Sequence, residues 1–127
     1  MLPVLRRSIF GLGFVLASLV SAEAALADSF GAISYSPETG ATGWSHSWDN
    51  RRKAERVAQE NCYANADDCR VAIWFNNACG AVAVGDDGGW GSAWAYNSRG
   101  AQRAAVAQCS RYSDGCRVVR WQCSGAR

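Results

Sequence analysis

Two short segments of the chain carry the side chains that could do acid–base chemistry. The first contains His46, the only histidine, which lies between Ser45 and Ser47 and close to Asp49. A serine–histidine–aspartate triad would use such residues, with the imidazole as the base. Alternate side chains of a strand point to opposite faces, however, so both serines would point away from His46. The pattern therefore favours His46 as a polar member of a surface flanked by tryptophans.

The second segment is the acidic pair Asp86-Asp87, with Gly85 before it and two glycines after it. Calcium would need about 6–8 oxygen ligands, and this segment offers two carboxylates without alternating spacing. The paired carboxylates of a glycosidase face each other across the substrate, whereas adjacent residues of a turn diverge. We therefore expect a hairpin turn here, with Asp86 and Asp87 as candidate ligand-binding residues. The alternative is a small secreted hydrolase that uses Asp86, Asp87 or His46.

Four tryptophans form a third group, in two pairs with the same spacing. Trp44 and Trp48 are four residues apart, as are Trp90 and Trp94, and Tyr96 follows the second pair. Residues four apart on a strand share a face, so each hairpin would present a tryptophan pair. Exposed rings of this kind stack on sugars or bind a protein partner. Buried rings would instead fill the core, and we expect this of at least half of them.

The six cysteines have the number and spacing of a disulfide framework. An even count in a small exported chain is typical of disulfides. None of these cysteines has the Cys-x-x-Cys spacing that zinc sites use. The sequence therefore predicts disulfides, and neither a metal site nor a cofactor. The residues concerned are Cys62, Cys69, Cys79, Cys109, Cys116 and Cys123.

The elements that must position these residues occur twice, because the chain repeats itself at an offset of 47 residues. So many coincidences in one register indicate an internal duplication. The matches are Asn50, Ala54, Arg56, Ala58, Cys62, Cys69, Arg70, Val71 and Trp74 with Asn97, Ala101, Arg103, Ala105, Cys109, Cys116, Arg117, Val118 and Trp121.

Each repeat predicts two strands, a helix and a third strand. In the first repeat we expect strands at 32–36, 43–48 and 69–75, with a helix from Asp49 or Asn50 to Cys62. The second repeat predicts strands at 80–84, 90–96 and 116–123, with a helix from Asn97 to Cys109.

The helix faces that would meet the sheet are mostly alanine, which buries little apolar area. Larger side chains must then fill the core, and we expect Trp74 and Trp121 to lie there. The predicted fold class is α+β: two pseudo-symmetric ββαβ repeats, residues 30–78 and 79–127, forming one small disulfide-stapled domain.

Six cysteines allow fifteen pairings, and symmetry between the repeats leaves several of them open. Cys62 ends a predicted helix and Cys69 begins the next strand, so their α-carbons can come within bridging range. The same holds for Cys109 and Cys116. We therefore expect these two disulfides, with Cys79–Cys123 as the third.

Residues 1–27 have the pattern of a cleavable secretory signal. Arg6 and Arg7 precede an apolar stretch over residues 8–20, and Ala25-Leu26-Ala27 supplies the small residues of a cleavage site. We expect cleavage after Ala27, with Ala24 as the alternative site. The apolar stretch is shorter than the roughly 18 residues that span a bilayer, which argues against the competing interpretation of a retained anchor. The sequence thus predicts a secreted or periplasmic domain, residues 28–127, without a stable membrane anchor.

The charge of this domain is nearly balanced. Removal of Arg6, Arg7 and Glu23 with the signal reduces the 13 basic and 11 acidic residues of the chain to 11 and 10. The longest basic run is Arg51-Arg52-Lys53, at the start of a predicted helix. Nucleic-acid binding would need a concentrated positive face, so we do not expect it.

Three segments together resemble the bacterial family known as domain of unknown function 4189. They are FGAISYSPETGATGWS, NACGAVAVGDDGGWG and the pair CRVAIW and CRVVRW, and they cover the chain from Phe30 to about Cys123. Members of the family are small exported proteins. The family has no established reaction, so the resemblance implies a fold and a compartment and assigns no catalytic residues.

The sequence as a whole therefore favours a small exported binding or interaction protein without catalysis. Its partner would be an envelope glycan or another protein. A secreted inhibitor or effector that acts on a partner protein is a further alternative beside the hydrolase.

Overall fold

Eight elements follow one another along the chain as two successive ββαβ units. The structure is a computed structural model that describes residues 11, 13 and 26–126, so most of the predicted signal lies outside the described residues. Within these residues, no helix is both long and apolar enough to cross a membrane. The elements are β1 (Phe30–Tyr35), β2 (Thr42–Trp48), α1 (Arg51–Tyr63), β3 (Arg70–Asn76), β4 (Ala78–Val84), β5 (Trp90–Ala95), α2 (Ser98–Cys109) and β6 (Arg117–Ser124). The predicted α+β class and the repeated element order are confirmed.

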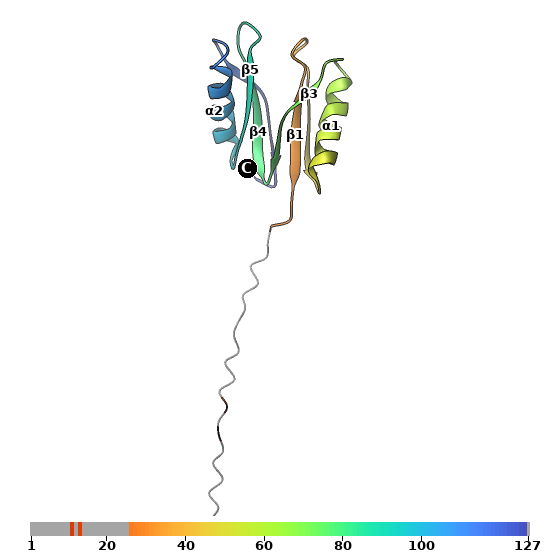
Figure 1. Cartoon of the computed structure of the whole chain (residues 1–127), viewed down its shortest axis with the longest axis vertical. Coiled ribbons are helices and arrows are strands. Elements are labelled where there is room, and N and C mark those ends of the chain that lie inside the picture. Colours follow the sequence, from red (N-terminus) through yellow and green to blue (C-terminus); the bar gives the residue numbers. More distant parts are fainter. Residues whose placement is uncertain (1–10, 12, 14–25, 127) are drawn as a thin grey trace, which may run out of the picture.

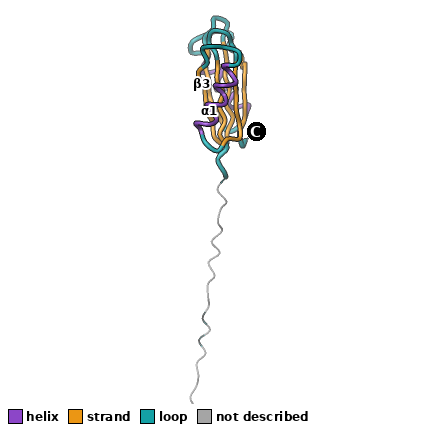
Figure 2. Tube along the Cα trace, turned by 90° about the vertical axis from the view of Figure 1, so that its right-hand side faces the viewer, coloured by secondary structure: helices purple, strands orange, loops and turns teal. Residues whose placement is uncertain are grey.

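Each unit forms its own three-stranded antiparallel sheet, and the two sheets pack face to face. The strand orders are β2-β1-β3 and β5-β4-β6, so β1 and β4 are the central strands. Helices α1 and α2 cover the outer faces of the two sheets, which gives four layers (Figure 1). The strands run along the length of the molecule, and many of the loops gather at one end (Figure 2). The chain passes from one sheet to the other through the single residue Asn77, between β3 and β4.

Each helix begins at an asparagine, as the sequence predicts for Asn97 and as one of two options at Asn50. The Asn50 side chain accepts a hydrogen bond from the backbone N–H of Lys53 at 2.9 Å. The Asn97 side chain accepts one from Gly100 at 2.7 Å. A side-chain acceptor at this position satisfies a helix N–H that has no partner inside the helix.

Glycines on the outer hairpin strands let both helices approach their sheets closely. A Cβ atom at Gly43 of β2 would lie 2.1 Å from the carbonyl oxygen of Ala58. A Cβ atom at Gly91 of β5 would lie 2.3 Å from the amide nitrogen of Cys109. Both contacts are with backbone, so no side chain can fit there. The helix residues buried against the sheets are small: Ala54, Ala58, Cys62, Ala101, Ala105 and Cys109.

The core between the two sheets is built around Phe75, which is 1% exposed. It packs with Ile33 and Tyr35 from one sheet and with Val82 from the other. Its ring lies against two glycines, because Cβ atoms at Gly31 and Gly80 would come within 2.3 Å and 2.5 Å of ring carbons. One large ring therefore fills the space that small residues leave in both central strands.

The expectation that Trp74 and Trp121 lie in the core is wrong. They are 37% and 48% exposed. Trp74 lies opposite Ala32 and Trp121 opposite Ala81, so both rings are on the outer faces of their sheets. Each helix packs mainly on the hairpin of its unit and less on the third strand. The outer faces of β3 and β6 are therefore only partly covered.

The expectation that Trp44 and Trp48 share a face is also wrong. The pairing of β1 with β2 is irregular between Phe30 and Ala32, and Ser47 has a positive φ of 64°. An extra residue in one strand moves the following side chains to the opposite face. Trp44 consequently lies opposite Ile33, while Trp48 packs beneath α1.

All three predicted disulfides are confirmed. Cys62–Cys69 and Cys109–Cys116 each join the end of a helix to the start of the following strand. Cys79–Cys123 joins directly opposite residues of β4 and β6. Each bond closes within one unit, so the contact between the two units depends on non-covalent packing.

Candidate functional site

An aromatic cleft lies where the ends of β3 and β5 face each other across the two sheets. Its volume is about 270 Å³, and it is lined by Trp74, Phe75, Asn76, Trp94 and Tyr96. We call this site the aromatic cleft. Trp94 and Tyr96 are 51% and 74% exposed, so their rings are open to solvent. All five lining side chains are uncharged.

One wall of the cleft comes from the end of β5. Trp94 lies opposite Gly80 on β4, which has no side chain to cover the indole. Tyr96 follows the strand directly and precedes Asn97, the cap of α2. The two rings are 5.4 Å apart at an angle of 81°, an edge-to-face contact that aromatic pairs favour. The ligand would therefore meet two rings at a right angle and not a flat platform.

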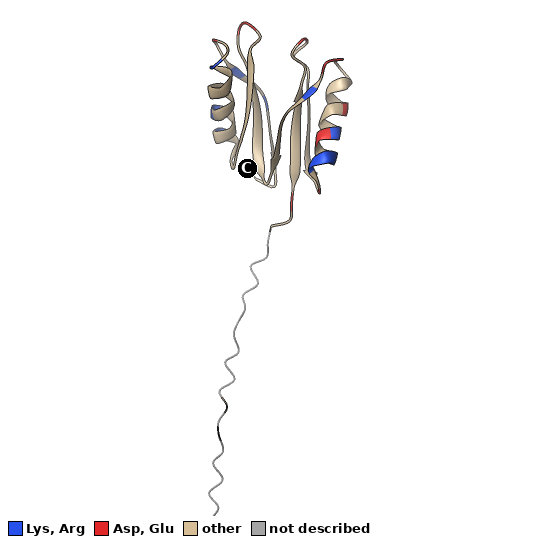
Figure 3. Ribbon diagram, viewed as in Figure 1, with Lys and Arg blue, Asp and Glu red and all other residues tan. Residues whose placement is uncertain are grey.

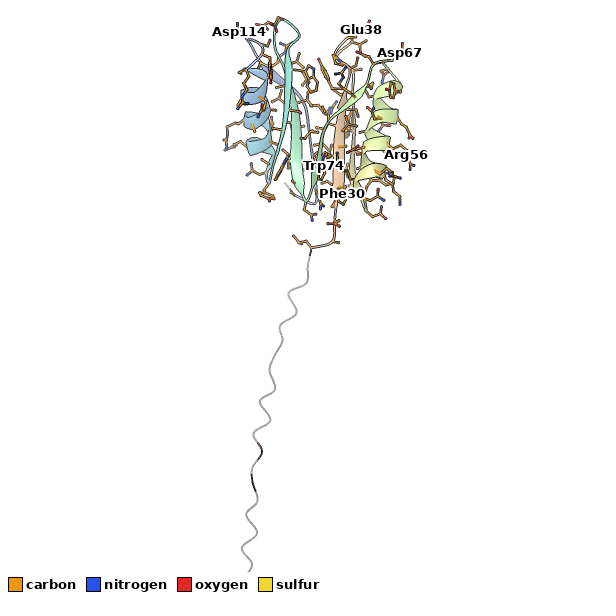
Figure 4. The ribbon with its side chains drawn as sticks, viewed as in Figure 1. Phe30, Glu38, Arg56, Asp67, Trp74 and Asp114 are labelled. Atoms are coloured by element: carbon orange, nitrogen blue, oxygen red, sulfur yellow. A yellow bond between two sulfur atoms is a disulfide. The ribbon has the colours of Figure 1, made fainter. Side chains whose placement is uncertain are left out.

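The other wall comes from the end of β3. Trp74 packs with Phe30 at 6.2 Å between ring centroids, and the guanidinium of Arg51 lies 4.3 Å from its ring centroid. Figure 4 shows Trp74 and Phe30 at the same end of the molecule. The amide of Asn76 accepts a hydrogen bond from the Ser29 N–H at 3.0 Å and donates one to Asp28 at 2.9 Å. The Trp74 ring thus lies on the outer face of its sheet, toward α1, and Trp74 borders the cleft from the end of β3 without its ring facing Trp94.

The remaining hairpin tryptophans lie outside the cleft. Trp90 packs with Tyr35 at 5.4 Å between ring centroids, on the inner face of its sheet. Trp44 lies where β2 faces β6, and the guanidinium of Arg120 stacks 3.8 Å from its ring centroid. Of the four predicted hairpin tryptophans, the structure thus places only Trp94 in the cleft, together with Tyr96.

His46 does not meet the two aspartates. Its ring is exposed, and its Nδ1 lies 2.9 Å from the hydroxyl of the neighbouring Ser47. It stands near the end of β2 that pairs with Phe30, whereas Asp86 and Asp87 are in the turn after β4, beside Asp114. Phe30 and Asp114 lie at opposite ends of the domain (Figure 4). The three residues of the alternative hydrolase are therefore not brought together.

Asp86 and Asp87 make structural contacts in a turn, as the sequence predicts. The Asp87 carboxylate accepts hydrogen bonds from the Ser113 hydroxyl and from the Gly89 N–H, the latter at 3.1 Å. Asp86 forms an exposed ion pair with Arg117 at 3.7 Å. These contacts join the hairpin of the second unit to the loop after α2.

The first unit makes the same connection with other residues. The Asp68 carboxylate accepts hydrogen bonds from the Ser36 hydroxyl and from the Glu38 N–H, the latter at 3.0 Å. The bond from Ser36 is the main reason why the pKa of Asp68 lies below its usual range. The bond from Ser113 lowers the pKa of Asp87 in the same way.

These two carboxylates predict a loss of stability in acid. A lowered folded pKa means that the unfolded state binds more protons, so the stabilisation is fully present above the unfolded pKa of about 3.9 and is lost as the pH falls through the folded pKa. We expect the Tm to fall between about pH 5 and pH 3. The double variant Asp68→Asn/Asp87→Asn should melt lower at pH 7 and lose less on acidification, because asparagine has no charge to neutralise.

Thermal melts of the unchanged protein and the double variant, followed by circular dichroism at pH 7 and at about pH 3, measure this difference in stability. Asp67→Asn, at the exposed neighbouring position, is the control and should behave as the unchanged protein does. A double variant that loses as much stability in acid as the unchanged protein would exclude these aspartates as the cause.

Three of the five residues that line the cleft are not predicted from the sequence to be binding residues. Trp74 was expected in the core, and Phe75 and Asn76 carry no chemical signal of their own. The end of β3 meets the end of β5 only through the packing of one sheet on the other, which no local pattern describes. The repeated Cys-Arg-Val-x-x-Trp segment was the available signal, because it places Trp74 near the end of its strand.

Comparison with known proteins places the whole domain in one family. No curated protein matches the chain. The structure is similar to the NMR structure of Rv1813c from Mycobacterium tuberculosis, with 28% sequence identity, a TM-score of 0.52, and coverage of 79% of this chain and 78% of that chain. The model of the family described as "Domain of unknown function (DUF4189)" matches residues 30–123, which include the aromatic cleft and all six cysteines. The chain therefore belongs to the DUF4189 family, as its sequence motifs indicate.

Proposed function

We propose that this protein is an exported, non-catalytic binding protein that binds a neutral envelope glycan in the aromatic cleft. The observation that supports this is the cleft itself: a concave, uncharged site in which Trp94 and Tyr96 are half or more exposed and stand at a right angle. Large exposed aromatic rings in a concavity are a feature of binding sites.

The chemistry of the lining suits a sugar ring. A pyranose has an apolar face of C–H groups and a rim of hydroxyls, so it pairs with an aromatic face and with neutral hydrogen-bonding groups. Trp94 and Tyr96 supply the faces, and the indole N–H and phenol hydroxyl can bond to the rim. Both side chains are half or more exposed, so both groups are accessible to a ligand.

The size of the cleft limits what it can hold. Small-molecule pockets begin at roughly 300 Å³, and this one measures about 270 Å³. It would accommodate one sugar ring, while neighbouring sugars of a chain would extend over the surface. A polymer presents many such rings, so weak binding at each one can still retain the protein on the polymer.

The proposed compartment agrees with the covalent chemistry. Three disulfides and no free cysteine among the described residues are typical of a protein that folds in an oxidising environment. We propose that residues 1–27 direct the chain across the membrane and that the cleaved domain meets its glycan in the periplasm or outside the cell.

The direct test is a titration of tryptophan fluorescence with soluble peptidoglycan fragments and with N-acetylglucosamine oligomers. Trp94→Ala should weaken binding about tenfold or more, because truncating a central aromatic contact costs about 1.4 kcal/mol or more. Trp44→Ala is the matched control, since Trp44 is also partly exposed (38%) but lies beneath Arg120, outside the cleft.

The outcomes separate the candidate functions. Binding that Trp94→Ala weakens and Trp44→Ala leaves unchanged supports the glycan site. If no glycan changes the fluorescence and a stable protein partner is captured from periplasm or culture medium, the ligand is a protein and not a glycan. Turnover of a glycan that is lost in Asp86→Asn or His46→Ala would instead establish the hydrolase.

A further inference from the structure

A second, larger groove lies on the outside of the second unit, between α2 and the edge strand β6. It consists of two adjoining cavities of about 440 Å³ and 460 Å³, which share Gln102 and Val118. Val106 and Ala107 of α2 form one side of the groove, and Val119 and Trp121 of β6 form the other. Val119 and Trp121 are 38% and 48% exposed. The groove exists because α2 packs mainly on β4 and β5 and leaves β6 partly uncovered.

The groove runs along a free sheet edge. Four consecutive residues of β6, 118–121, line one of the cavities. Because consecutive side chains of a strand point to opposite faces, the cavity must border the strand backbone as well as one face of the strand. β6 is the outermost strand of its sheet and pairs with β4 alone. Apart from the ladder with β4, no backbone hydrogen bond joins residues 117–122 to another part of the described chain. An extended peptide could therefore pair with this edge while its alternate side chains enter the groove.

The rim of the groove is basic. Helix α2 and strand β6 together contain four arginines, at positions 99, 103, 117 and 120, and no acidic residue. Arg103 lines the groove directly. Figure 3 shows acidic and basic segments side by side on α1, while no acidic segment appears on α2. Arg117 forms an ion pair with Asp86 and the Arg120 guanidinium lies over Trp44, so Arg99 and Arg103 of α2 are the two without such a contact among the described residues.

The equivalent positions of the first unit carry different chemistry. At the offset of 47 residues, Gln59 and Glu60 replace Val106 and Ala107. Glu60 pairs with Arg56 at 3.9 Å, and Arg51 covers the ring of Trp74, the counterpart of Trp121. Charged side chains of α1 thus pair with one another, and Arg51 also covers the ring of Trp74. The second unit has Gln102 and Ala107 at the positions of Glu55 and Glu60, and it has Arg103 at the position of Arg56. Its groove therefore combines apolar side chains with an arginine that has no acidic neighbour on α2.

We infer that the groove between α2 and β6 binds an extended peptide segment of a partner protein in which acidic residues alternate with apolar ones. The apolar side chains fill the space between Val106, Val118 and Trp121, the acidic side chains meet Arg103 and its neighbours, and the peptide backbone pairs with β6. A second copy of this chain fits less well, because β6 carries arginines that would face each other and a bulge at Val119 that opposes regular edge pairing.

Fluorescence polarisation tests this with a labelled peptide of about eight residues in which glutamate alternates with valine. The same peptide with lysine in place of glutamate is the ligand control. Ala107→Glu introduces the acidic residue of the first unit at an exposed helix position, and Arg103→Glu reverses the charge of the rim. We expect each variant to weaken binding of the acidic peptide about fivefold. Arg56→Glu, the equivalent change in the first unit, should leave the affinity unchanged.

Each other outcome overturns the inference. Equal binding of the lysine peptide would show that charge does not select the partner. Equal loss in Arg56→Glu and Arg103→Glu would show a general charge effect with no site. Sedimentation of the unchanged protein as a dimer that Val119→Glu dissociates would assign the groove to a second copy. Failure of the acidic peptide, with retention on anionic lipid vesicles that Arg103→Glu abolishes, would assign it to a membrane surface.

Discussion

Replacing Phe75 by alanine should destabilise the domain by about 3–5 kcal/mol, the usual cost of removing a buried phenylalanine side chain. This ring is the largest fully buried side chain, and it contacts residues of both units. The neighbouring backbone cannot collapse into the space, because β1 and β4 are held at their positions by their own strands and helices. The cavity would therefore remain, and the full cost should appear in the free energy of unfolding.

Equilibrium denaturation in urea measures this cost. Gln122→Ala is the matched control, because Gln122 occupies the position of Phe75 in the second unit and is half-buried. It should cost less than about 1 kcal/mol, as expected for a polar side chain that is only half-buried. A loss below about 1 kcal/mol for Phe75→Ala would mean that the two sheets do not meet over this ring.

Removing the Cys79–Cys123 disulfide should cost more than removing either of the other two. A disulfide stabilises mainly by restricting the unfolded chain, and the effect grows with the length of the closed loop. Cys79 and Cys123 are 44 residues apart in sequence, whereas Cys62 and Cys69 are seven apart. We expect the double variant Cys79→Ala/Cys123→Ala to lose about 4 kcal/mol, against about 2.5 kcal/mol for Cys62→Ala/Cys69→Ala.

The same denaturation experiment on the two double variants provides the comparison. Alanine is used in both cases because it leaves no free thiol and is tolerated at buried positions. Equal losses for the two variants would mean that the unfolded chain is already restricted by residual structure. A smaller loss for Cys79→Ala/Cys123→Ala would contradict the loop-length explanation altogether.

The sequence predicted the elements well because each element has a local signal. The caps at Asn50 and Asn97, the alanine stripes and the cysteines at helix ends all lie within a few residues of the structure that they specify. The pairings Cys62–Cys69 and Cys109–Cys116 followed from those positions, and Cys79–Cys123 was the pair that remained. The repeat also constrained the prediction, since each unit had to make sense in both copies.

The predictions that failed depended on a bulge or on the packing of one sheet on the other. The spacing of Trp44 and Trp48 predicts one shared face, yet Trp44 lies opposite Ile33 between the sheets and Trp48 packs beneath α1. The extra residue near Ser47 shifts the register, and only the pairing of strands reveals it. The exposure of Trp74 and Trp121 depends on how far a helix extends over its sheet, which periodicity along one strand does not encode.

Duplication followed by divergence explains why the two units present different surfaces. Both keep the close helix contact at Gly43 and Gly91, which the fold requires. The third strands differ more: Ile73 lies between the sheets, while Arg120 at the equivalent position reaches Trp44 at the sheet edge. A fold held by two small, covalently closed units can accept such changes at its edges without loss of its core.

Whether this domain binds its ligand at the aromatic cleft can be read from the indole N–H signals in a ¹H–¹⁵N NMR spectrum. The chain has six tryptophans, so each of the six signals can be assigned by single substitution. On addition of soluble peptidoglycan fragments, we expect the signal of Trp94 to shift while those of Trp44 and Trp48 stay in place. Shifts at Trp44 with none at Trp94 would contradict it.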